Sequence, residues 1–466
     1  MTTVINTHLS ESRGKKRIWL EGTKLVREKI SPGLRFDIVK KDNKLILKFG
    51  ESGKYKVSQR TRRGVISPII DLVNSMITEL FRDTRAIRVS IKNLVMTISQ
   101  HFSDDAISRR ENRLMTKILN GKSLSTCSLF HGGGILDSAL HEGFEKGGVQ
   151  LTMDIVVERE KPYLESSLCN NSALYNSQSI ILESDIELID LNRQMDREVD
   201  FLIAGIPCTG ASKAGRSKNK TWGDKHVESH KDSGAMFYYF LRFVEKLNPA
   251  IILIENVLEY SKSSGMDVIR FVLGKNGYVL QETVVNGNEF GVLENRDRMC
   301  VVAISADMVN CFSIDDVAPV RQKECFLSDV LEDIDDDSDV WKTYDYLQSK
   351  AEKDASSGKG FKRQLLRGDE SKLGTILKGY AKARSTEPFI VNANNSSLSR
   401  LLTVKEHCAV KGVPFELVSG LSKTTAHEVL GQSVIYPAFV AIASQLAKCL
   451  YSFVKENSNN TPALNT

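Results

Sequence analysis

A cysteine and a glutamate follow two apolar segments of the chain at the points where buried strands would end. Residues 201–206 are apolar without alternation and lead into Pro207 and Cys208, and residues 250–254 lead into Glu255. Proline ends a strand because it fixes φ and lacks an N–H donor. A thiol and a carboxyl group at the carboxyl ends of neighbouring strands can share a cleft, which nucleophilic attack with assisted protonation requires.

Polar side chains also accompany the other predicted strands. Arg296 and Arg298 precede the apolar run 299–304, and alternation would place both on one face of a strand. Asn256 follows Glu255 and could instead cap a helix. Taken singly, each of these residues has an ordinary structural interpretation, and Cys208 could be a core residue.

A glycine-rich turn follows the first of these strands. The segment 130–137 reads F-H-G-G-G-I-L-D, and glycines there let backbone amides and a helix amino terminus approach a ligand, although a plain tight turn fits equally well. Glu158 ends the next strand and Asp185 follows the third. Acids at successive strand ends suit a ribose and an adenine amino group, which favours S-adenosylmethionine over a dinucleotide.

The elements that position these residues alternate between strands and helices. Strands are expected at residues 126–130, 151–158, 179–182, 201–206, 251–254 and 299–304, separated by helical stretches, with an apolar extended piece at 278–285. This order predicts an α/β fold with a doubly wound, mostly parallel sheet. A final helix is expected at residues 437–451, followed by a disordered tail from 456 to 466.

Composition excludes several protein classes. The 466 residues are 41% hydrophobic and 26% charged, and no apolar run approaches a membrane span, so a cytoplasmic protein without membrane contact is expected. Eight scattered cysteines include no Cys-x-x-Cys pair, which argues against a zinc site and a disulfide scaffold, and no metal site is predicted.

The first 122 residues are basic, with 26 Lys and Arg against 12 Asp and Glu. This charge predicts a nucleic-acid-binding accessory domain, although a solvated basic surface is the alternative. We expect a frayed segment at 1–16, strands at 34–39 and 44–49, and a helix at 66–81. About 35 residues from Trp19 to Phe49 weakly resemble swapped-hairpin DNA-binding domains of the AbrB/SymE kind.

Six blocks, taken in order, resemble the DNA (cytosine-5) methyltransferase family. They are F-H-G-G-G-I-L-D at 130–137, I-P-C-T-G-A-S at 206–212, I-E-N-V at 254–257, E-N-R-D-R at 294–298, R-L-L-T-V-K-E at 400–406 and G-Q-S-V at 431–434. The resemblance covers residues 125–451, with a variable segment between 306 and 398.

The resemblance implies the fold, the reaction and a role for each site residue. The fold would be that of S-adenosylmethionine-dependent methyltransferases, which is Rossmann-like. Cys208 would attack C6 of a cytosine flipped out of double-stranded DNA, and Glu255 would assist at N3. Arg298 would hold the base O2, Arg296 would support the site and Asn256 would brace the Pro-Cys loop. The cofactor residues would be Phe130, Gly132, Gly133, Gly134, Glu158, Asp185, Pro207, Phe237 and Gln432.

The sequence departs from the family pattern at positions that carry no chemistry of their own. Thr209 replaces the usual Gln, Leu293-Glu294 replaces Pro-Gln, Gln432 replaces Asn, and Ile135 replaces a glycine. These changes are compatible with an active enzyme. The alternatives are an RNA (tRNA) cytosine-5 methyltransferase of the same architecture and an inactive DNA-binding regulator.

The resemblance also divides the chain into domains. Residues 1–122 would be the accessory domain, 123–307 the catalytic domain, 308–420 a smaller target-recognition domain, and 421–455 a helix that completes the catalytic domain. A monomer on DNA is expected, with a companion restriction enzyme as a possible partner. The predicted DNA contacts of the recognition domain are Phe361, Lys362, Arg363, Arg367, Lys372, Lys378, Tyr380, Lys382 and Arg384.

Overall fold

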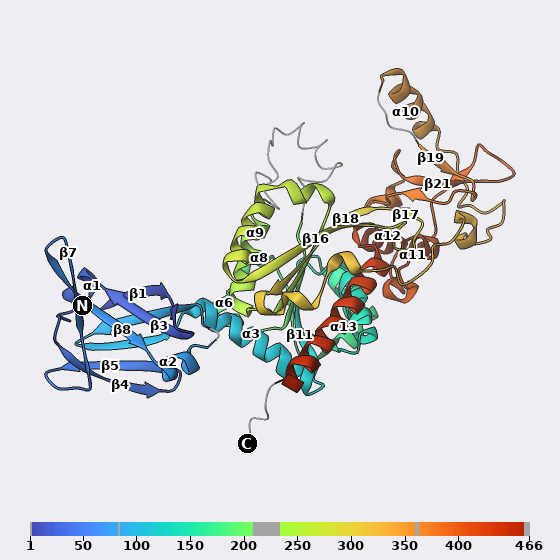
Figure 1. Cartoon of the computed structure of the whole chain (residues 1–466). Helices are drawn as coiled ribbons and strands as arrows, with labels where there is room; N and C mark the ends of the chain where they lie inside the picture. The colour runs from blue at the N-terminus through green and yellow to red at the C-terminus, as the bar shows by residue number, and fades with distance from the viewer. Residues whose placement is uncertain (1, 83, 208–233, 359–362, 461–466) are drawn as a thin grey trace. The chain divides into compact units, whose positions relative to one another are not determined.

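The computed structural model describes residues 2–82, 84–207, 234–358 and 363–460. The chain divides into two compact units, Met1–Arg109 and Arg110–Thr466 (Figure 1). Cys208 and the rest of the segment 208–233 lie outside the described residues, as do Phe361 and Lys362.

The first unit consists of two antiparallel sheets and two short helices. One sheet has the strand order β1-β9-β10-β5-β4-β6 and the other β2-β3-β8-β7. Alternate residues of the strands point inward, and Leu45, Leu47, Val89 and Ile98 are fully buried. The elements are β1 Thr3–His8, β2 Ser10–Ser12, β3 Lys15–Glu21, α1 Thr23–Arg27, β4 Arg35–Lys41, β5 Lys44–Gly50, β6 Tyr55–Lys56, β7 Ser58–Arg62, β8 Val65–Val73, α2 Ser75–Leu80, β9 Ala86–Lys92 and β10 Val95–Gln100.

Two local predictions for this unit are wrong. Residues 3–16 of the segment predicted to be frayed are not frayed, because β1 pairs along its whole length with β9 and β2 pairs with β3. Residues 66–81 do not form one helix, because residues up to Val73 belong to strand β8, which pairs with β3. The apolar residues of this stretch satisfy both periodicities, and pairing with β3 favours the strand.

The second unit is built on a seven-stranded sheet with the order β13-β12-β11-β14-β15-β18-β16. The first five strands are mutually parallel, whereas β18 runs antiparallel to both β15 and β16. The predicted doubly wound, mostly parallel sheet is therefore confirmed. The strands are β11 Leu124–Leu129, β12 Leu151–Glu158, β13 Tyr175–Glu183, β14 Phe201–Gly205, β15 Ile251–Asn256, β16 Tyr278–Asn286 and β18 Asp297–Ser305.

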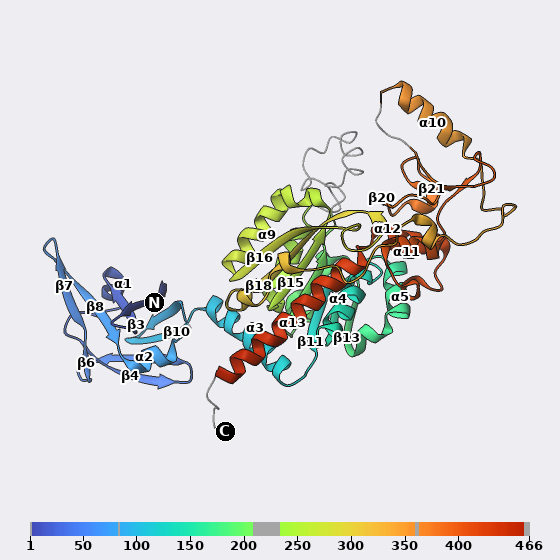
Figure 2. The ribbon, with the colours of Figure 1, turned by 45° about the vertical axis from the view of Figure 1, so that its right-hand side comes forward.

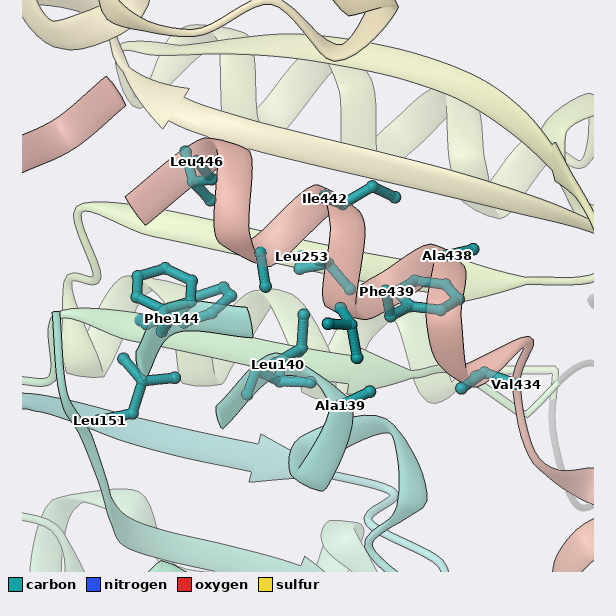
Figure 3. Packing of buried hydrophobic residues seen from close by; sticks show 14 of the residues in the cluster. Ala139, Leu140, Phe144, Leu151, Leu253, Val434, Ala438, Phe439, Ile442 and Leu446 are labelled. Atoms are coloured by element: carbon teal, nitrogen blue, oxygen red, sulfur yellow. The ribbon is translucent and has the colours of Figure 1, made fainter. Parts of the chain in front are cut away.

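Helices cover both faces of this sheet (Figures 1 and 2). Helices α8 and α9 lie on one face, and α4 and α13 lie on the other. Phe439, Ile442 and Leu446 of α13 pack against Leu140 and Phe144 of α4 and the sheet (Figure 3). The helices of this unit are α4 Ile135–Lys146, α5 Lys161–Asn170, α6 Leu191–Gln194, α8 Met236–Leu247, α9 Ser264–Lys275, α10 Asp345–Ser356, α11 Val404–Lys411, α12 Lys423–Gln432 and α13 Tyr436–Asn460.

Helix α13 differs from its prediction in two ways. It extends to Asn460, so residues 456–460 are helical and not part of a disordered tail. By its length and the mean hydropathy of its apolar 18-residue window, 1.3, the helix could also cross a membrane, but 67% of that window is buried within the unit. Its contact with α4 is close, because a Cβ at Gly143 would lie 2.4 Å from the Cβ of Ala443.

The boundary between the two units falls inside helix α3, Phe102–Leu119, earlier than the predicted residue 122. Arg110 of this helix is buried and donates hydrogen bonds to Ser305 Oγ, at 2.8 Å, and to Gly277 O, at 2.8 Å. Arg113 and Lys117 both pair with the buried carboxylate of Asp200. The second half of α3 is therefore part of the unit that contains the large sheet.

Short elements make up most of residues 308–420. Strands β19 Gln364–Leu366, β21 Pro388–Val391 and β22 Ser399–Arg400 form a small sheet, and β17 Glu294–Asn295 pairs with β20 Leu373–Gly374. Helix α11 begins at a capping box, in which Thr403 Oγ1 accepts from the Glu406 N–H and the Glu406 carboxylate accepts from the Thr403 N–H.

Candidate functional site

A cleft of about 1200 Å³ opens at the carboxyl ends of the parallel strands. This is the expected place for a site in a doubly wound sheet. Predicted site residues from the ends of six strands and from α12 line it. They are Phe130, Gly132, Gly133, Glu158, Asp185, Pro207, Glu255, Asn256, Arg296, Arg298 and Gln432.

Two predicted cofactor residues do not line this cleft. Gly134 lies behind the turn, where a Cβ would come within 2.2 Å of Ser167 Oγ. Phe237 of α8 packs toward Gly265, and its neighbour Met236 lines the cleft instead. Cys208 lies outside the described residues, and the chain enters that segment from Pro207 at the cleft wall.

The glycine turn between β11 and α4 brings the backbone to the surface of the cleft. Phe130 and Gly132 have φ values of 58° and 59°. Glycine adopts this left-handed conformation without strain, whereas other residues adopt it rarely. A Cβ at Gly133 would lie 2.5 Å from Cγ1 of Val429, so this position accommodates only glycine. At Gly132 and Gly133 the wall of the cleft is therefore formed by backbone atoms and not by side chains.

The acids after β12 and β13 have different environments. Glu158 is buried, and its carboxylate accepts hydrogen bonds from the Gly132 N–H at 2.6 Å and the Glu160 N–H at 2.8 Å. These bonds hold the glycine turn against the end of β12. Asp185 is about half exposed at the cleft, with Arg159 Nη1 3.8 Å from its carboxylate.

Asn256 connects the ends of strands β14 and β15. Its Nδ2 donates to the carbonyl of Ile206 at 3.0 Å, and its Oδ1 accepts from the Val257 N–H at 2.9 Å. The side chain is buried. It thereby holds the backbone directly before Pro207, the last described residue before Cys208.

Glu255 and Arg298 form an ion pair within the cleft. Arg298 Nε lies 2.9 Å from Glu255 Oε1, and each side chain is 13% exposed. Strands β15 and β18 are neighbours, and this pairing brings the two side chains together. Burial raises the pKa of Glu255, although the charges of Arg298, Arg296 and Lys411 oppose the shift. A carboxyl group whose pKa is raised can act as a general acid or base toward a bound substrate.

Arg296 is fully buried, and its guanidinium connects separate segments of the chain by hydrogen bonds. Its Nη1 donates to the carbonyl of Ile376 at 3.1 Å, and its Nη2 donates to the carbonyl of Gly431 at 3.2 Å. Burial and the neighbouring Arg298 lower its pKa to about 10. The guanidinium therefore joins the strand that carries Arg298 to the segment after β20 and to α12.

Sequence reasoning missed the partner of Glu294. Lys411 Nζ, from the end of α11, lies 2.7 Å from Glu294 Oε2, and neither side chain is exposed. Glu294 Oε1 accepts from the Ile376 N–H at 2.8 Å. Burial alone would raise the pKa of Glu294, but Lys411 and Arg296 hold it below its usual range. The departure at Glu294 was visible in sequence, but nothing there identified Lys411.

Basic side chains from residues 378–384 face the same cleft. Lys378, Lys382 and Arg384, all predicted DNA contacts, line it. Tyr380 was wrongly predicted to be one of them. It is fully buried, and its hydroxyl donates to the carbonyl of Pro388 at 2.8 Å and accepts from the Leu402 N–H at 2.8 Å.

The arrangement combines a buried acid, a guanidinium and a turn of exposed backbone at one sheet edge. It suits proton transfer to a planar, hydrogen-bonding substrate held in the cleft. Within the described ranges, no group of three or more His, Cys, Asp or Glu side chains could hold a metal ion.

Comparisons with known proteins agree on one family. The family model described as C-5 cytosine-specific DNA methylase matches residues 124–448. Type II methyltransferase M1.ScrFI of Lactococcus lactis subsp. cremoris is 26% identical over 54% of this chain and 63% of its own length. Type II methyltransferase M.SsoII of Shigella sonnei is 27% identical, over 58% of this chain and 69% of its own.

The chain thus spans less than two thirds of M1.ScrFI. Among solved structures, the S. pombe Dnmt2 methyltransferase superposes with a TM-score of 0.52 at 17% identity, over 72% of this chain and 100% of that protein. At this identity the likeness shows the fold.

Proposed function

The chain belongs to the C-5 cytosine-specific DNA methylase family, and on that premise we propose that it methylates C5 of cytosine in double-stranded DNA through the cleft of the second unit. The family predicted from the six ordered blocks is confirmed, and with it the class of enzyme. The observation that carries the proposal is the buried Glu255–Arg298 pair at the edge of the sheet.

The residues around the glycine turn fit S-adenosylmethionine, the methyl donor of this family. When bound, this group would supply the methyl that is transferred. Gly132 and Gly133 leave backbone in place of side chains, which allows close approach of a ligand. Glu158 and Asp185 would accept hydrogen bonds from a ribose and an adenine amino group, and Phe130, Pro207 and Gln432, which also line the cleft, would surround the ligand.

The residues at the other part of the cleft would handle the base. The thiol of Cys208 would add to C6, forming a bond to sulfur and shifting electron density to C5 and N3. Glu255, whose pKa is raised by burial, would share a proton with N3. Arg298 would donate to the base O2 while its contact with Glu255 orients the carboxyl group. After methylation, loss of the C5 proton would release the thiol.

DNA would contact the basic side chains of both units. Lys378, Lys382 and Arg384 line the cleft at positions where phosphates or base edges could be bound. The first unit, with 22 Lys and Arg against 11 Asp and Glu in residues 1–109, would add further phosphate contacts. A companion restriction enzyme, monomeric action on DNA and a nucleoid location in the cytoplasm belong to the same proposal.

Covalent trapping tests the reaction directly. A duplex carrying 5-fluorocytosine at the methylated position should trap the protein, because elimination requires loss of a proton from C5. Cys208→Ser should abolish trapping and methylation, whereas Cys169→Ser, an exposed cysteine on α5, should retain both. Undiminished methylation by Cys208→Ser would refute the assignment.

The substrate is identified by mapping methylated cytosines in DNA and RNA from cells that express the protein. Bisulfite sequencing should find them at one recurring DNA sequence. Methylation confined to tRNA would favour the RNA-modifying alternative, and the absence of methyl transfer to either polymer, with intact DNA binding, would favour an inactive regulator.

A further inference from the structure

The first unit consists of two copies of the same arrangement. The first copy runs β1-β2-β3-α1-β4-β5, and the second runs β6-β7-β8-α2-β9-β10. Each sheet contains equivalent strands from both copies, and each strand order reads the same from either end when equivalent strands are exchanged. The copies share little sequence, so the repetition became visible only in the fold.

The strand registers place a pseudo-two-fold axis between the copies. Trp19 and Asp71, equivalent residues of β3 and β8, lie opposite each other at the centre of one antiparallel pairing. Ile46 and Thr97, equivalent residues of β5 and β10, lie opposite each other at the centre of the second. An antiparallel pair of equivalent strands that meets at equivalent residues has two-fold symmetry. The unit is therefore an intramolecular dimer.

Each copy carries one projecting hairpin, which we call an arm. The first arm is β2–β3 and turns at Arg13-Gly14, with φ values of 52° and 73°. The second arm is β7–β8 and turns at Arg63-Gly64, with φ values of 51° and 77°. Two central residues with positive φ are typical of type I′ hairpin turns. The end of the second arm stands out from the rest of the unit in both views (Figures 1 and 2).

The arms are exposed and basic. All five residues of β7 are exposed, and on β8 Val65 and Ile66 are 64% and 57% exposed. Residues 58–67 include three arginines and no acid. The first arm has four basic residues and two acids: Glu11 lies 3.5 Å from Lys16, and Glu21 lies 3.4 Å from Arg60 of the second arm. Such a surface does little for the core of the unit, but its charge suits a polyanion.

We propose that the two arms bind duplex DNA together, each in one groove, so that a single chain recognises a site with approximate two-fold symmetry. A two-stranded β-ribbon fits the major groove. Trp19 lies five positions after Gly14 along the strand, and Asp71 lies seven positions after Gly64. At about 3.3 Å per residue the tips are at most about 40 Å apart, which is comparable with one turn of DNA, about 34–36 Å.

Salt-dependent binding by the full chain tests this proposal. Arg62→Gln/Arg63→Gln removes two charges from the second arm, and Arg13→Gln/Lys15→Gln removes two from the first. The control, Lys40→Gln/Lys41→Gln, removes two exposed charges from β4 on the other sheet. Each arm variant should reduce the slope of log affinity against log salt by about 2, at about 0.9 for each phosphate contact. The control should change it by less than half as much. Equal effects in all three variants would refute the arms as the contact.

A hydroxyl-radical footprint tests the spacing. The wild-type chain should protect two segments about one helical turn apart, and each arm variant should lose one of them. A single segment that weakens equally in both variants would overturn the two-armed arrangement.

The proposal rests on DNA as the substrate, but not on methyl transfer, so methylation is assayed in parallel. Methyl transfer with a salt slope that is insensitive to the arms would refute this inference alone. Arm-dependent binding without any methyl transfer would refute only the proposed reaction.

Discussion

The buried pair Glu294–Lys411 should contribute measurably to the free energy of unfolding. Lys411→Met keeps the length of the side chain but leaves the Glu294 carboxylate without its 2.7 Å partner in an environment closed to water. Removing one partner of a buried ion pair typically costs about 3–5 kcal/mol. We expect about 3 kcal/mol, because Glu294 keeps the Ile376 N–H and has Arg296 Nη1 3.5 Å away.

The reverse substitution, Glu294→Gln, should cost less, because the remaining lysine can lose its proton. Burial and the neighbouring Arg296 lower the pKa of Lys411 to about 7, despite Glu294. Without Glu294 the pKa of Lys411 falls further, so in Glu294→Gln the lysine can lose its proton at pH 6, and we expect a cost of about 2 kcal/mol there. The double variant contains no unpaired charge at this position, so its free energy of unfolding should lie within about 1 kcal/mol of that of the wild type. The two substitutions should thus be coupled by about 3 kcal/mol or more.

Urea unfolding at pH 6, where Lys411 of the wild type is protonated, measures these values by far-ultraviolet circular dichroism, with the transition of the second unit fitted separately. Lys146→Met is the control, because Lys146 pairs with Glu142 on the exposed surface of α4 and should change the free energy of unfolding by about 0.5 kcal/mol or less. Additive costs in the double variant, or single costs no larger than the control, would refute the reasoning.

Three further outcomes follow from buried groups. Glu255→Gln should slow methyl transfer by about 10²-fold or more while donor binding persists. The raised pKa means that folded Glu255 keeps its proton at pH values where the unfolded chain has lost it, so the free energy of unfolding of the wild type should fall with pH in that range. The stability of Glu255→Gln relative to the wild type should therefore rise with pH, and a pH-independent difference would argue against this. Burial lowers the pKa of His427 to about 4, so its contribution to stability is lost as pH falls, by about 2 kcal/mol between pH 7 and 5, and His427→Phe should reduce that slope in urea unfolding. Removal of residues 1–101 should leave a folded enzyme, whereas removal of 1–118 should not, because Asp200 would lose both cations, and equal solubility and activity of the two truncations would contradict this.

The first unit shows where local sequence patterns fail to predict secondary structure. Its β-rich, basic character was predictable from alternation and composition, but residues 66–81 were assigned to a helix. The buried side chains of Ile70 and Leu72 are placed by pairing of β8 with β3, a contact about 50 residues distant in sequence. Local spacing does not report such a partner.

The sequence by itself determined the order of strands in the chain, the cleft at their carboxyl ends and a set of site residues, most of which line that cleft. It could do so because buried parallel strands are continuous apolar runs, and chemistry follows their carboxyl ends. The resemblance to one family then assigned chemical roles to residues such as Glu255 and Arg298.

Only the tertiary structure decided which groups meet. It paired Glu255 with Arg298, gave Glu294 the distant Lys411, buried Tyr380 and placed Gly134 behind the turn. It also revealed the duplicated first unit, whose copies share strand registers and turn conformations more than residues. The physical reason is that burial and ion pairing depend on distances across the fold, whereas a sequence pattern records only neighbours along the chain.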